Sequence, residues 1–271
     1  MSKVALVTGA SSGIGAATAR RLTRAGYTVY GAARRTDRLA ELASDGVRAL
    51  ELDLTEESSI EAAAQALLAE AGRIDVLVNN AGYGSYGALE DVPLSEARRQ
   101  FEVNVFGLAR LTQLLLPTMR AQGSGRIVNV TSMGGRLTMP LGGWYHATKY
   151  AVEAYSDALR LEVRPFGIDV IIVEPGSIAT EWGGIAAENA ATFSGQGPYA
   201  SRAQALQRAM SSPRMANVGS SPELIADVIA KGVAAKRPRV RYVAGALARP
   251  LLTLKAVLPD RAFDALLARV L

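Results

Sequence analysis

The segment Thr8-Gly9-Ala10-Ser11-Ser12-Gly13-Ile14-Gly15 joins an apolar run, Val4–Thr8, to a pattern of helical spacing over Ile14–Ala25. Glycine has no side chain, so a turn that contains three glycines can bend tightly and admit a close approach by another molecule. The helix that follows presents free N–H groups and the positive end of its dipole to that turn. A strand, a glycine-rich turn and a helix in this order therefore predict a site for the pyrophosphate of a dinucleotide.

The rest of the chain continues this alternation of short apolar strands and amphipathic helices. Several strands are apolar on both faces, which is expected where helices cover both sides of a parallel sheet. The sequence therefore predicts an α/β fold, a Rossmann-type doubly wound parallel sheet of about seven strands flanked by helices, in a single domain. The predicted strands are Val4–Thr8, Thr28–Ala32, Val47–Glu51, Val76–Asn79, Arg126–Thr131, Ile168–Val173 and Val240–Val243, and the predicted helices are Ile14–Ala25, Ser58–Ala71, Ser95–Met119, Tyr145–Val163 and Pro222–Ala234.

The alternation weakens after Pro175. Residues 183–220 are rich in Ala, Gly, Ser and Asn and have no strong strand pattern. We therefore expect a variable substrate loop over about 180–220 that acts as a lid. The C-terminal tail is expected to form amphipathic helix that is broken at Pro250 and again at Pro259.

Composition argues against several kinds of site. The chain has no cysteine and one histidine, His146, which excludes thiolate chemistry and argues against a histidine-built metal site or a Ser-His-Asp hydrolase. The net charge of +5 comes from scattered Lys and Arg residues, so we expect no nucleic-acid partner. No apolar run approaches the ~20 residues that span a bilayer, and no signal-peptide pattern is present, so we expect a cytoplasmic protein without a membrane span.

The end of the second predicted strand bears on the choice between the two nicotinamide cofactors. An NAD site commonly has an acidic residue there, which holds the ribose hydroxyls. This chain has Ala32-Ala33-Arg34-Arg35 instead. A guanidinium can pair with a 2′-phosphate, so we predict NADP(H) as the cofactor, with Arg34 as the main contact. The alternative is that both arginines are merely exposed at the start of a helix.

A second set of polar residues lies further along the chain. Tyr145 and Lys149 are four residues apart on a predicted helix, so they share one face. A free tyrosine titrates near pH ~10, and a nearby ammonium or a positively charged nicotinamide would favour its phenolate form. Ser132 follows a predicted strand, where ligands of open α/β sheets gather. On its own, a Tyr–Lys pair with this spacing is at least as often an ordinary pair on the surface of a helix. The glycine turn upstream is what supports a catalytic interpretation.

With these motifs the sequence resembles the short-chain dehydrogenase/reductase family, in its NADP-preferring group. The resemblance runs from Lys3 to about Thr180 and rests on the glycine turn, Asp53-Leu54, Asn79-Asn80-Ala81-Gly82, Asn104, Ser132, Tyr145 with Lys149, and Pro175-Gly176. The segment from Tyr145 to Gly176 is most similar to the retinol and 17β-hydroxysteroid dehydrogenase branch. This resemblance implies an NADP(H)-dependent oxidoreductase that interconverts a carbonyl and a secondary or primary alcohol on a bulky apolar substrate.

The resemblance also implies roles for individual residues. Tyr145 would be the general acid in reduction and the base in oxidation, while Lys149 would bind the nicotinamide ribose and lower the tyrosine pKa. Ser132 would orient the substrate oxygen. Asn104 would hold a water of a proton relay, or else be a polar kink in a long helix. The implied cofactor contacts are Gly9, Ser11, Ser12, Gly13, Ile14, Gly15, Arg34, Arg35, Asp53, Leu54, Asn80, Ala81, Gly82, Tyr145, Lys149, Pro175, Gly176, Ile178 and Thr180.

The substrate pocket is less defined. Side chains near the motif ends are candidates for its wall, and ordinary core packing explains each of them equally well. These candidates are Tyr83, Met133, Leu141 and Trp182, with Leu137 and Met139 near them. His146 points about 100° away from Tyr145 on a helix, so we expect it on the helix surface or in an interface rather than in catalysis.

Two alternative functions belong to other classes. A nucleotide-sugar epimerase or dehydratase also uses a Tyr–Lys pair, but typically with a different glycine spacing and a longer C-terminal domain. A non-catalytic NADP(H)-sensing regulator typically lacks the tyrosine or the lysine, whereas Ser132, Tyr145 and Lys149 are all present here. The family resemblance further implies a homodimer or homotetramer that associates through the helices predicted at Ser95–Met119 and Tyr145–Val163.

Overall fold

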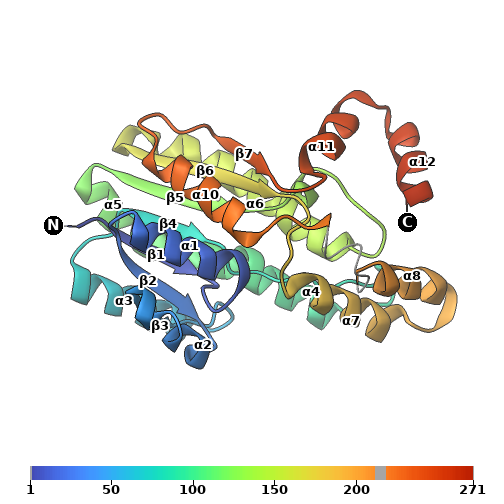
Figure 1. Ribbon diagram of the computed structural model, residues 1–271, viewed down its shortest axis with the longest axis horizontal. Coiled ribbons are helices and arrows are strands. Elements are labelled where there is room, and N and C mark those ends of the chain that lie inside the picture. Colours follow the sequence, from blue (N-terminus) through green and yellow to red (C-terminus); the bar gives the residue numbers. More distant parts are fainter. Residues whose placement is uncertain (1, 211–217, 271) are drawn as a thin grey trace.

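The computed structural model describes residues 2–210 and 218–270. Within these residues, seven strands pair in one parallel sheet with the order β3-β2-β1-β4-β5-β6-β7 (Figure 1). Their bounds are β1 Val4–Thr8, β2 Thr28–Ala33, β3 Val47–Glu51, β4 Val76–Asn79, β5 Gly125–Val130, β6 Ile168–Pro175 and β7 Arg241–Ala244. The prediction of a doubly wound parallel sheet is therefore confirmed. The strand order reverses between β1 and β4, which places a ligand crevice at the carboxyl ends of these strands.

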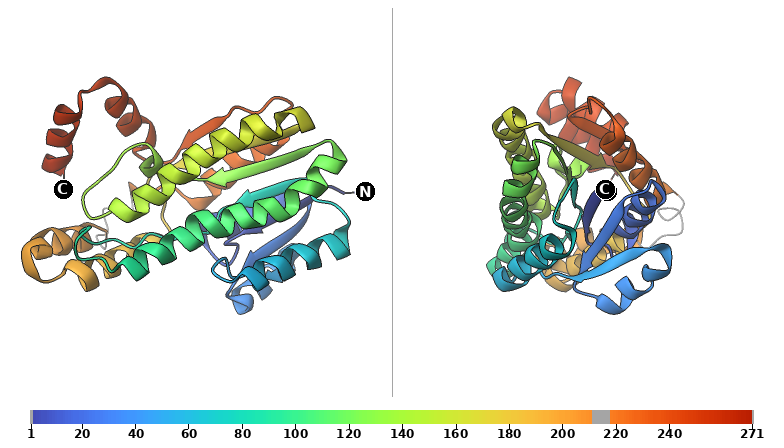
Figure 2. Two further views of the ribbon diagram at one scale, coloured as in Figure 1. Left: turned by 180° about the vertical axis from the view of Figure 1, so that it is seen from behind. Right: turned by 90° about the vertical axis from the view of Figure 1, so that its left-hand side faces the viewer.

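Helices cover both faces of the sheet (Figure 2). The helices of the described residues are α1 Gly13–Arg24, α2 Thr36–Ala40, α3 Glu57–Ala71, α4 Leu94–Phe101, α5 Gly107–Gln122, α6 Gly143–Val163, α7 Trp182–Ser194, α8 Ala200–Met210, α10 Pro222–Ala234, α11 Ala248–Val257 and α12 Asp260–Val270. Helices α1 and α10 pack on one face, and α3, α5 and α6 pack on the other. None of the helices in the described ranges is long and apolar enough to cross a bilayer.

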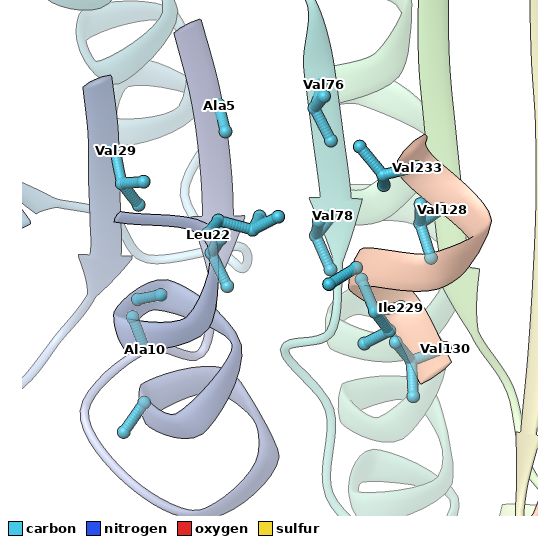
Figure 3. Close-up of a cluster of buried hydrophobic side chains, with 14 of the residues drawn as sticks. Ala5, Ala10, Leu22, Val29, Val76, Val78, Val128, Val130, Ile229 and Val233 are labelled. Carbon is cyan, nitrogen blue, oxygen red and sulfur yellow. The ribbon is translucent and has the colours of Figure 1, made fainter. Parts of the chain in front are cut away.

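The two-sided burial explains why the strands are apolar throughout. Successive side chains of a strand point to opposite faces, so Ala5 and Val7 join the core under α1 and α10, while Val4 and Leu6 join the core on the other side. Figure 3 shows the first of these cores, where the strand residues face Leu22 of α1 and side chains of α10. Both faces of β1 are thus sealed from water, and the strand can continue directly into the glycine turn.

The long helix predicted at Ser95–Met119 is interrupted. Helix α4 ends at Phe101, a π-helical turn spans Glu102–Phe106, and α5 begins at Gly107. Such turns are rare and frequently lie at functional sites. Here the turn contains Asn104, whose buried side chain has partners outside its own helix.

The segment expected as a variable loop is largely helical where it is described. Helices α7 and α8 pack against each other as a pair that extends past the carboxyl ends of the strands (Figure 1). Residues 211–217 of the same segment lie outside the described residues. In the tail, the predicted break at Pro259 separates α11 from α12, but the break predicted at Pro250 is wrong. Pro250 lies in the first turn of α11, where a missing N–H costs no helical hydrogen bond.

Candidate active site

The glycine turn after β1 has a backbone that requires glycine. Gly9 has a φ of +67° and Gly13 a φ of +52°, and side chains rarely adopt this left-handed region. A Cβ atom at Gly15 would overlap the carbonyl oxygen of Gly9, and one at Gly9 would lie 2.9 Å from the Ala81 Cα. The Ser12 side chain makes no cap bond at the start of α1. The turn thus offers a close backbone approach and free N–H groups, which fits a pyrophosphate.

The end of β4 holds this turn in place. The Thr8 hydroxyl accepts the N–H groups of Asn80 and Ala81, each at 3.0 Å. The Asn80 side-chain amide donates to the Thr8 carbonyl at 2.9 Å. The side chain of Asn80, which the family resemblance assigns to the cofactor, thus also positions the first residue of the turn.

The structure places Arg35 rather than Arg34 against the glycine turn. The Arg35 guanidinium donates to the Ser11 hydroxyl at 3.2 Å and to the Ser12 hydroxyl at 3.1 Å. It also lies 3.4 Å from a carboxylate oxygen of Glu181, which is 3.5 Å from Arg38. The sequence prediction counted no acidic residue at this position, because Glu181 comes from a segment 146 residues away. A phosphate at this site would therefore meet a cluster of arginines that already has a carboxylate partner.

Other predicted cofactor residues lie around the same crevice. Thr180 packs on the turn, since a Cβ atom at Gly13 would lie 3.1 Å from its methyl group. Gly82 lies beside the proposed catalytic lysine, with its Cβ position 3.7 Å from the Lys149 Nζ. The Asp53 carboxylate accepts the backbone N–H of Thr55 at 2.9 Å and the Thr55 hydroxyl at 2.8 Å. Among the remaining predicted contacts, the Gly176 backbone is bound to Ala244 of β7, and Ile178 forms a bridge to Ser220.

Ser132, Tyr145 and Lys149 come together at the carboxyl end of β5. Ser132 follows this strand, and its hydroxyl lies near enough to that of Tyr145 to act on the pKa of the tyrosine, which it lowers. The Lys149 Nζ donates to the carbonyl of Val130, the last residue of β5, at 2.9 Å. The same Nζ lies 5.9 Å from the centroid of the Tyr145 ring. A hydroxyl pair and an ammonium thus face one small volume, which is suited to proton transfer at a carbonyl oxygen.

Burial moves both titratable groups toward their neutral forms. It raises the pKa of Tyr145 to about 12, with only the Ser132 hydrogen bond acting in the opposite direction. It lowers the pKa of Lys149 to about 8, against the attraction of Glu153. The expected lowering of the tyrosine pKa by Lys149 is therefore not found among these side chains: desolvation of the phenolate outweighs the effect of Ser132, which alone acts in the opposite direction. At neutral pH this tyrosine carries its proton, as a general acid must.

Asn104 is fixed on three sides within the π-helical turn. Its side-chain amide donates to the Tyr83 carbonyl at 2.9 Å and to the Thr148 hydroxyl at 3.0 Å, while its oxygen accepts the Tyr83 N–H at 3.1 Å. Thr148 in turn donates to the Tyr145 carbonyl at 2.7 Å. Asn104 thus lies in an interruption of the helix, and the water relay stays a prediction. The Thr148 hydroxyl links Asn104 to the helical turn that carries Tyr145.

An aromatic cluster covers Tyr145. The ring centroid of Trp182, the first residue of α7, is 5.0 Å from that of Tyr145, and Tyr86 is 5.9 Å away. The bare face of Gly84 makes room for the indole, because a Cβ atom there would overlap it. Leu141 belongs to the same buried cluster, which α7 and α8 complete with Ala186, Ala190, Ala203 and Leu206. Tyr86 was missed by the sequence analysis, since no motif distinguishes it from other loop aromatics.

Two of the predicted pocket residues face elsewhere. Met133 packs with Leu137 and Met139 against α11 and α12. The Tyr83 hydroxyl donates to Glu96 at 3.0 Å, and the Arg99 guanidinium lies 5.9 Å from its ring. Neither residue belongs to the cluster around Tyr145, because each has its partners on another element, and their part in a substrate pocket stays a prediction.

His146 is also not where the sequence analysis expected it. Its side chain is only 1% exposed, so it does not lie on the surface of the helix. The loop over residues 133–142 folds back onto the first turn of α6 and covers it. Helical periodicity of α6 could not reveal this, since the covering segment, which starts with a short 3-10 helix at Met133–Gly135, lies outside α6.

Comparisons with known proteins agree with this geometry. A family model described as short chain dehydrogenase matches residues 3–190. A 3-ketodihydrosphingosine reductase from Bacteroides thetaiotaomicron is 38% identical, over 95% of this chain and 94% of that protein. An NADPH-dependent 3-dehydrocapnine reductase from Ornithobacterium rhinotracheale is 34% identical, over 97% of this chain and 95% of that protein. The crystal structure of a short-chain dehydrogenase from Streptomyces avermitilis has a TM-score of 0.82 and 39% identity, covering 100% of this chain and 97% of that one.

Proposed function

Because this chain belongs to the short-chain dehydrogenase family, we propose that it is an NADP(H)-dependent oxidoreductase that interconverts a carbonyl and an alcohol on a bulky apolar substrate. The observation that carries the proposal is the meeting of Ser132, Tyr145 and Lys149 beside a glycine turn that fits a pyrophosphate. A bound nicotinamide supplies the hydride in reduction and accepts it in oxidation.

The side chains of this chain handle the proton. In reduction, Tyr145 donates its phenolic proton to the carbonyl oxygen as hydride reaches the carbonyl carbon, and in oxidation the phenolate takes the proton back. Ser132 orients the oxygen by a second hydrogen bond. Lys149 holds a positive charge within 5.9 Å of the tyrosine ring, which stabilises the phenolate that remains. Asn104 and Thr148 fix the helical turn that carries the tyrosine.

The preference for NADP(H) rests on the arginines after β2. Arg35 already lies on the serines of the glycine turn, with Arg34 before it and Arg38 within reach of Glu181. A 2′-phosphate is a doubly charged acceptor that a guanidinium binds well. The NADPH dependence in the name of the Ornithobacterium relative supports the same choice.

The substrate is proposed to be a ketone on a long aliphatic chain. The wall around Tyr145 is apolar and aromatic, with Leu141, Tyr86 and Trp182 in contact range. Such a wall gains free energy by covering hydrocarbon and offers little to a small polar sugar. The Bacteroides relative is named for a keto derivative of dihydrosphingosine, which is a long-chain base. This similarity favours a linear chain over the steroid-like substrate that the family branch implies.

The experiment is a substrate panel in which NADPH consumption is followed spectroscopically. It compares 3-ketodihydrosphingosine, a steroid ketone, an acetoacetyl thioester and a keto sugar, with NADH run in parallel. We expect the long-chain ketone with NADPH to give the highest kcat/KM. Tyr145→Phe should lower kcat by roughly 10²–10⁴-fold, while NADPH binding, measured by fluorescence titration, stays unchanged. Undiminished turnover by Tyr145→Phe would contradict the catalytic assignment, and activity confined to the sugar would contradict the substrate class.

The protein is further proposed to be a homodimer or homotetramer. Leu94 and Phe106 are 57% and 56% exposed on α4 and the turn that follows it. Together with Phe101 and Trp144 they line one surface depression. Ala97 and the charged residues Arg98 and Glu102 complete its lining. Large apolar side chains that are exposed together in this way are typical of a face that another chain covers.

A further inference from the structure

Both ring nitrogens of His146 are bound to the backbone of the loop over residues 133–142. Nδ1 is 2.9 Å from the Gly134 carbonyl oxygen, and the Met139 N–H donates to Nε2 at 3.1 Å. A carbonyl can only accept and an amide N–H can only donate, so the ring is neutral with its proton on Nδ1. The histidine therefore ties two points of one loop to the first turn of α6.

Gly134 connects this ring to the catalytic serine. Its N–H donates to the Ser132 hydroxyl oxygen at 3.0 Å, while its carbonyl accepts from His146. The Gly135 N–H also donates to the Ser132 carbonyl at 2.9 Å. Hydrogen bonds thus fix both the N–H and the carbonyl of Gly134. The Ser132 oxygen accepts from a donor in a fixed position, and the proton of the Ser132 hydroxyl stays available for Tyr145 or a substrate.

The other end of the loop carries part of the apolar wall. Beyond Met139, Leu141 adopts a φ of +67°, which is rare for a residue with a side chain. Its carbonyl accepts the Gly87 N–H at 2.7 Å. The His146 ring therefore binds the loop at two points, one next to Ser132, which orients the substrate oxygen, and one close to Leu141, which belongs to the cluster around Tyr145.

The loop is shaped to receive the ring. A Cβ atom at Gly134 would lie 2.7 Å from Nδ1, and one at Gly142 would lie 2.7 Å from Nε2. Both distances are too short for a side chain, so the two glycines are what admits the histidine. The aromatic neighbours are Tyr86, with its ring centroid 6.3 Å away, and Tyr145 at 5.6 Å.

We propose that His146 is a positioning residue for the reaction, which acts through Gly134 to hold the Ser132 hydroxyl in place. The inference rests on the proposed function, because it needs Ser132 to orient the substrate oxygen. The Nδ1 bond is the one that matters for catalysis, and the Nε2 bond keeps the far end of the loop closed.

Three substitutions separate these contributions. In His146→Asn the side-chain amide reaches the position of Nδ1 and can donate to Gly134. In His146→Gln the side-chain oxygen reaches the position of Nε2 and can accept from Met139. His146→Phe keeps a ring and loses both bonds. A misplacement of about 1 Å can lower a rate by ~100-fold, so we expect His146→Phe to lower kcat by about 10- to 100-fold and His146→Asn to recover more of it than His146→Gln. The KM for NADPH should stay unchanged in all three.

A double variant tests whether the effect passes through Ser132. If it does, His146→Phe added to Ser132→Ala lowers kcat no further than Ser132→Ala alone. Fully multiplicative losses, or a His146→Phe variant with wild-type kcat, would overturn the proposal. The matched control is Ser156→Ala, a buried hydrogen-bonded residue of the same helix. It should lower thermal stability and leave kcat alone. A normal rate in Ser132→Ala by itself would instead indicate that the proposed function is wrong at this residue.

The ring can also be observed without turnover. His146 is the only histidine, so its nitrogen signals in an NMR spectrum are assigned at once. Burial lowers its pKa, while the Gly134 carbonyl acts in the opposite direction. The titratable groups that face it are the two tyrosines, Tyr86 and Tyr145, whose own pKa values are raised. We expect the neutral Nδ1–H form to persist at pH 6.5, where a free histidine is half protonated. An Nε2–H form would overturn the assignment.

Discussion

Two residues of the candidate site, Tyr145 and Lys149, are both driven toward the uncharged state by the same burial. The pKa of the tyrosine rises to about 12 and that of the lysine falls to about 8. A neutral tyrosine is the correct form for donating a proton, while a neutral lysine is the wrong form for stabilising the phenolate. The alkaline limit of the reduction is therefore set by Lys149, the group of the two whose pKa lies nearer neutrality.

The pH dependence of reduction follows from this asymmetry. Lys149 is cationic below pH 8 and loses its charge above it, so kcat/KM for reduction should be level near neutrality and fall above about pH 8. Lys149→Arg keeps a charge at all accessible pH values. That variant should be slower, and its profile should lack the fall above pH 8. A wild-type profile that stays level until tyrosine itself titrates would contradict this reasoning. The measurement is steady-state rates across a buffer series.

The ion pair between Arg35 and Glu181 gives a prediction on cofactor affinity. Glu181 is paired with the Arg35 guanidinium, which a 2′-phosphate would otherwise bind, and both side chains of the pair are about half exposed. Exposed pairs contribute ~0.2–1 kcal/mol, so Glu181→Gln should lower the KM for NADPH by about 1.5- to 5-fold and leave that for NADH nearly unchanged. Arg35→Ala should raise the KM for NADPH alone.

The matched control for Glu181→Gln is Glu188→Gln, which removes the same charge from an exposed position of α7. It should affect neither cofactor. A fall in both KM values for Glu181→Gln would indicate a general electrostatic effect instead of competition for Arg35.

At the scale of single elements, the strands could be predicted to within two residues because burial on both faces leaves an unbroken apolar run, and four of the five helices given bounds, α1, α3, α6 and α10, were predicted equally closely. The pattern over Pro222–Ala234 matches α10 at both ends. The π-helical turn could not be predicted, since the Asn104 side chain is held there by the Tyr83 backbone, which both donates to it and accepts from it, and by the Thr148 hydroxyl, which accepts from it. Helix α7 was missed because its Ala-rich sequence has weak amphipathic periodicity.

The π-helical turn should be costly to disturb. Asn104→Ala leaves the part-buried Tyr83 N–H without its acceptor and the buried Thr148 hydroxyl without its donor. Unmet hydrogen bonds of this kind cost ~1–3 kcal/mol each. We therefore expect the free energy of unfolding to fall by about 2–4 kcal/mol in a urea titration. A loss below about 0.5 kcal/mol would mean that water replaces the amide without penalty.

For the site, the sequence was sufficient to find residues that recur in fixed order, and insufficient where a contact joins distant segments. Ser132, Tyr145 and Lys149 were found because their spacing and their place after a strand are local properties. Glu181 was missed and His146 was misplaced because their partners come from other parts of the fold: Arg35 lies 146 residues away from Glu181, and the loop over residues 133–142 covers His146.

Over the whole molecule, the apolar surface on α4 and the following turn is the place where assembly can be tested. Phe106→Asp puts a charge in the middle of that surface, where burial against another chain would be costly. We expect this variant to be monomeric by size-exclusion chromatography with light scattering, while the wild-type protein is an oligomer. Val257→Asp, at an equally apolar and 68% exposed position of α11, is the control and should leave the oligomer intact. An unchanged oligomer in Phe106→Asp would place the interface elsewhere.

The indole of Trp182, which rests on Gly84 and covers Tyr145, also bears on how affinity should be understood here. Tyr145 is only 7% exposed and its ring packs against the indole of Trp182, the first residue of α7, so we expect a substrate that reaches the tyrosine hydroxyl to displace this indole. Entry of a substrate and displacement of this helix are then a single thermodynamic exchange. A measured dissociation constant would therefore include the free energy of moving the Trp182 indole from its packed to its displaced position. A variant in which α7 packs less tightly would bind substrate with higher affinity although it makes no additional contact to the substrate.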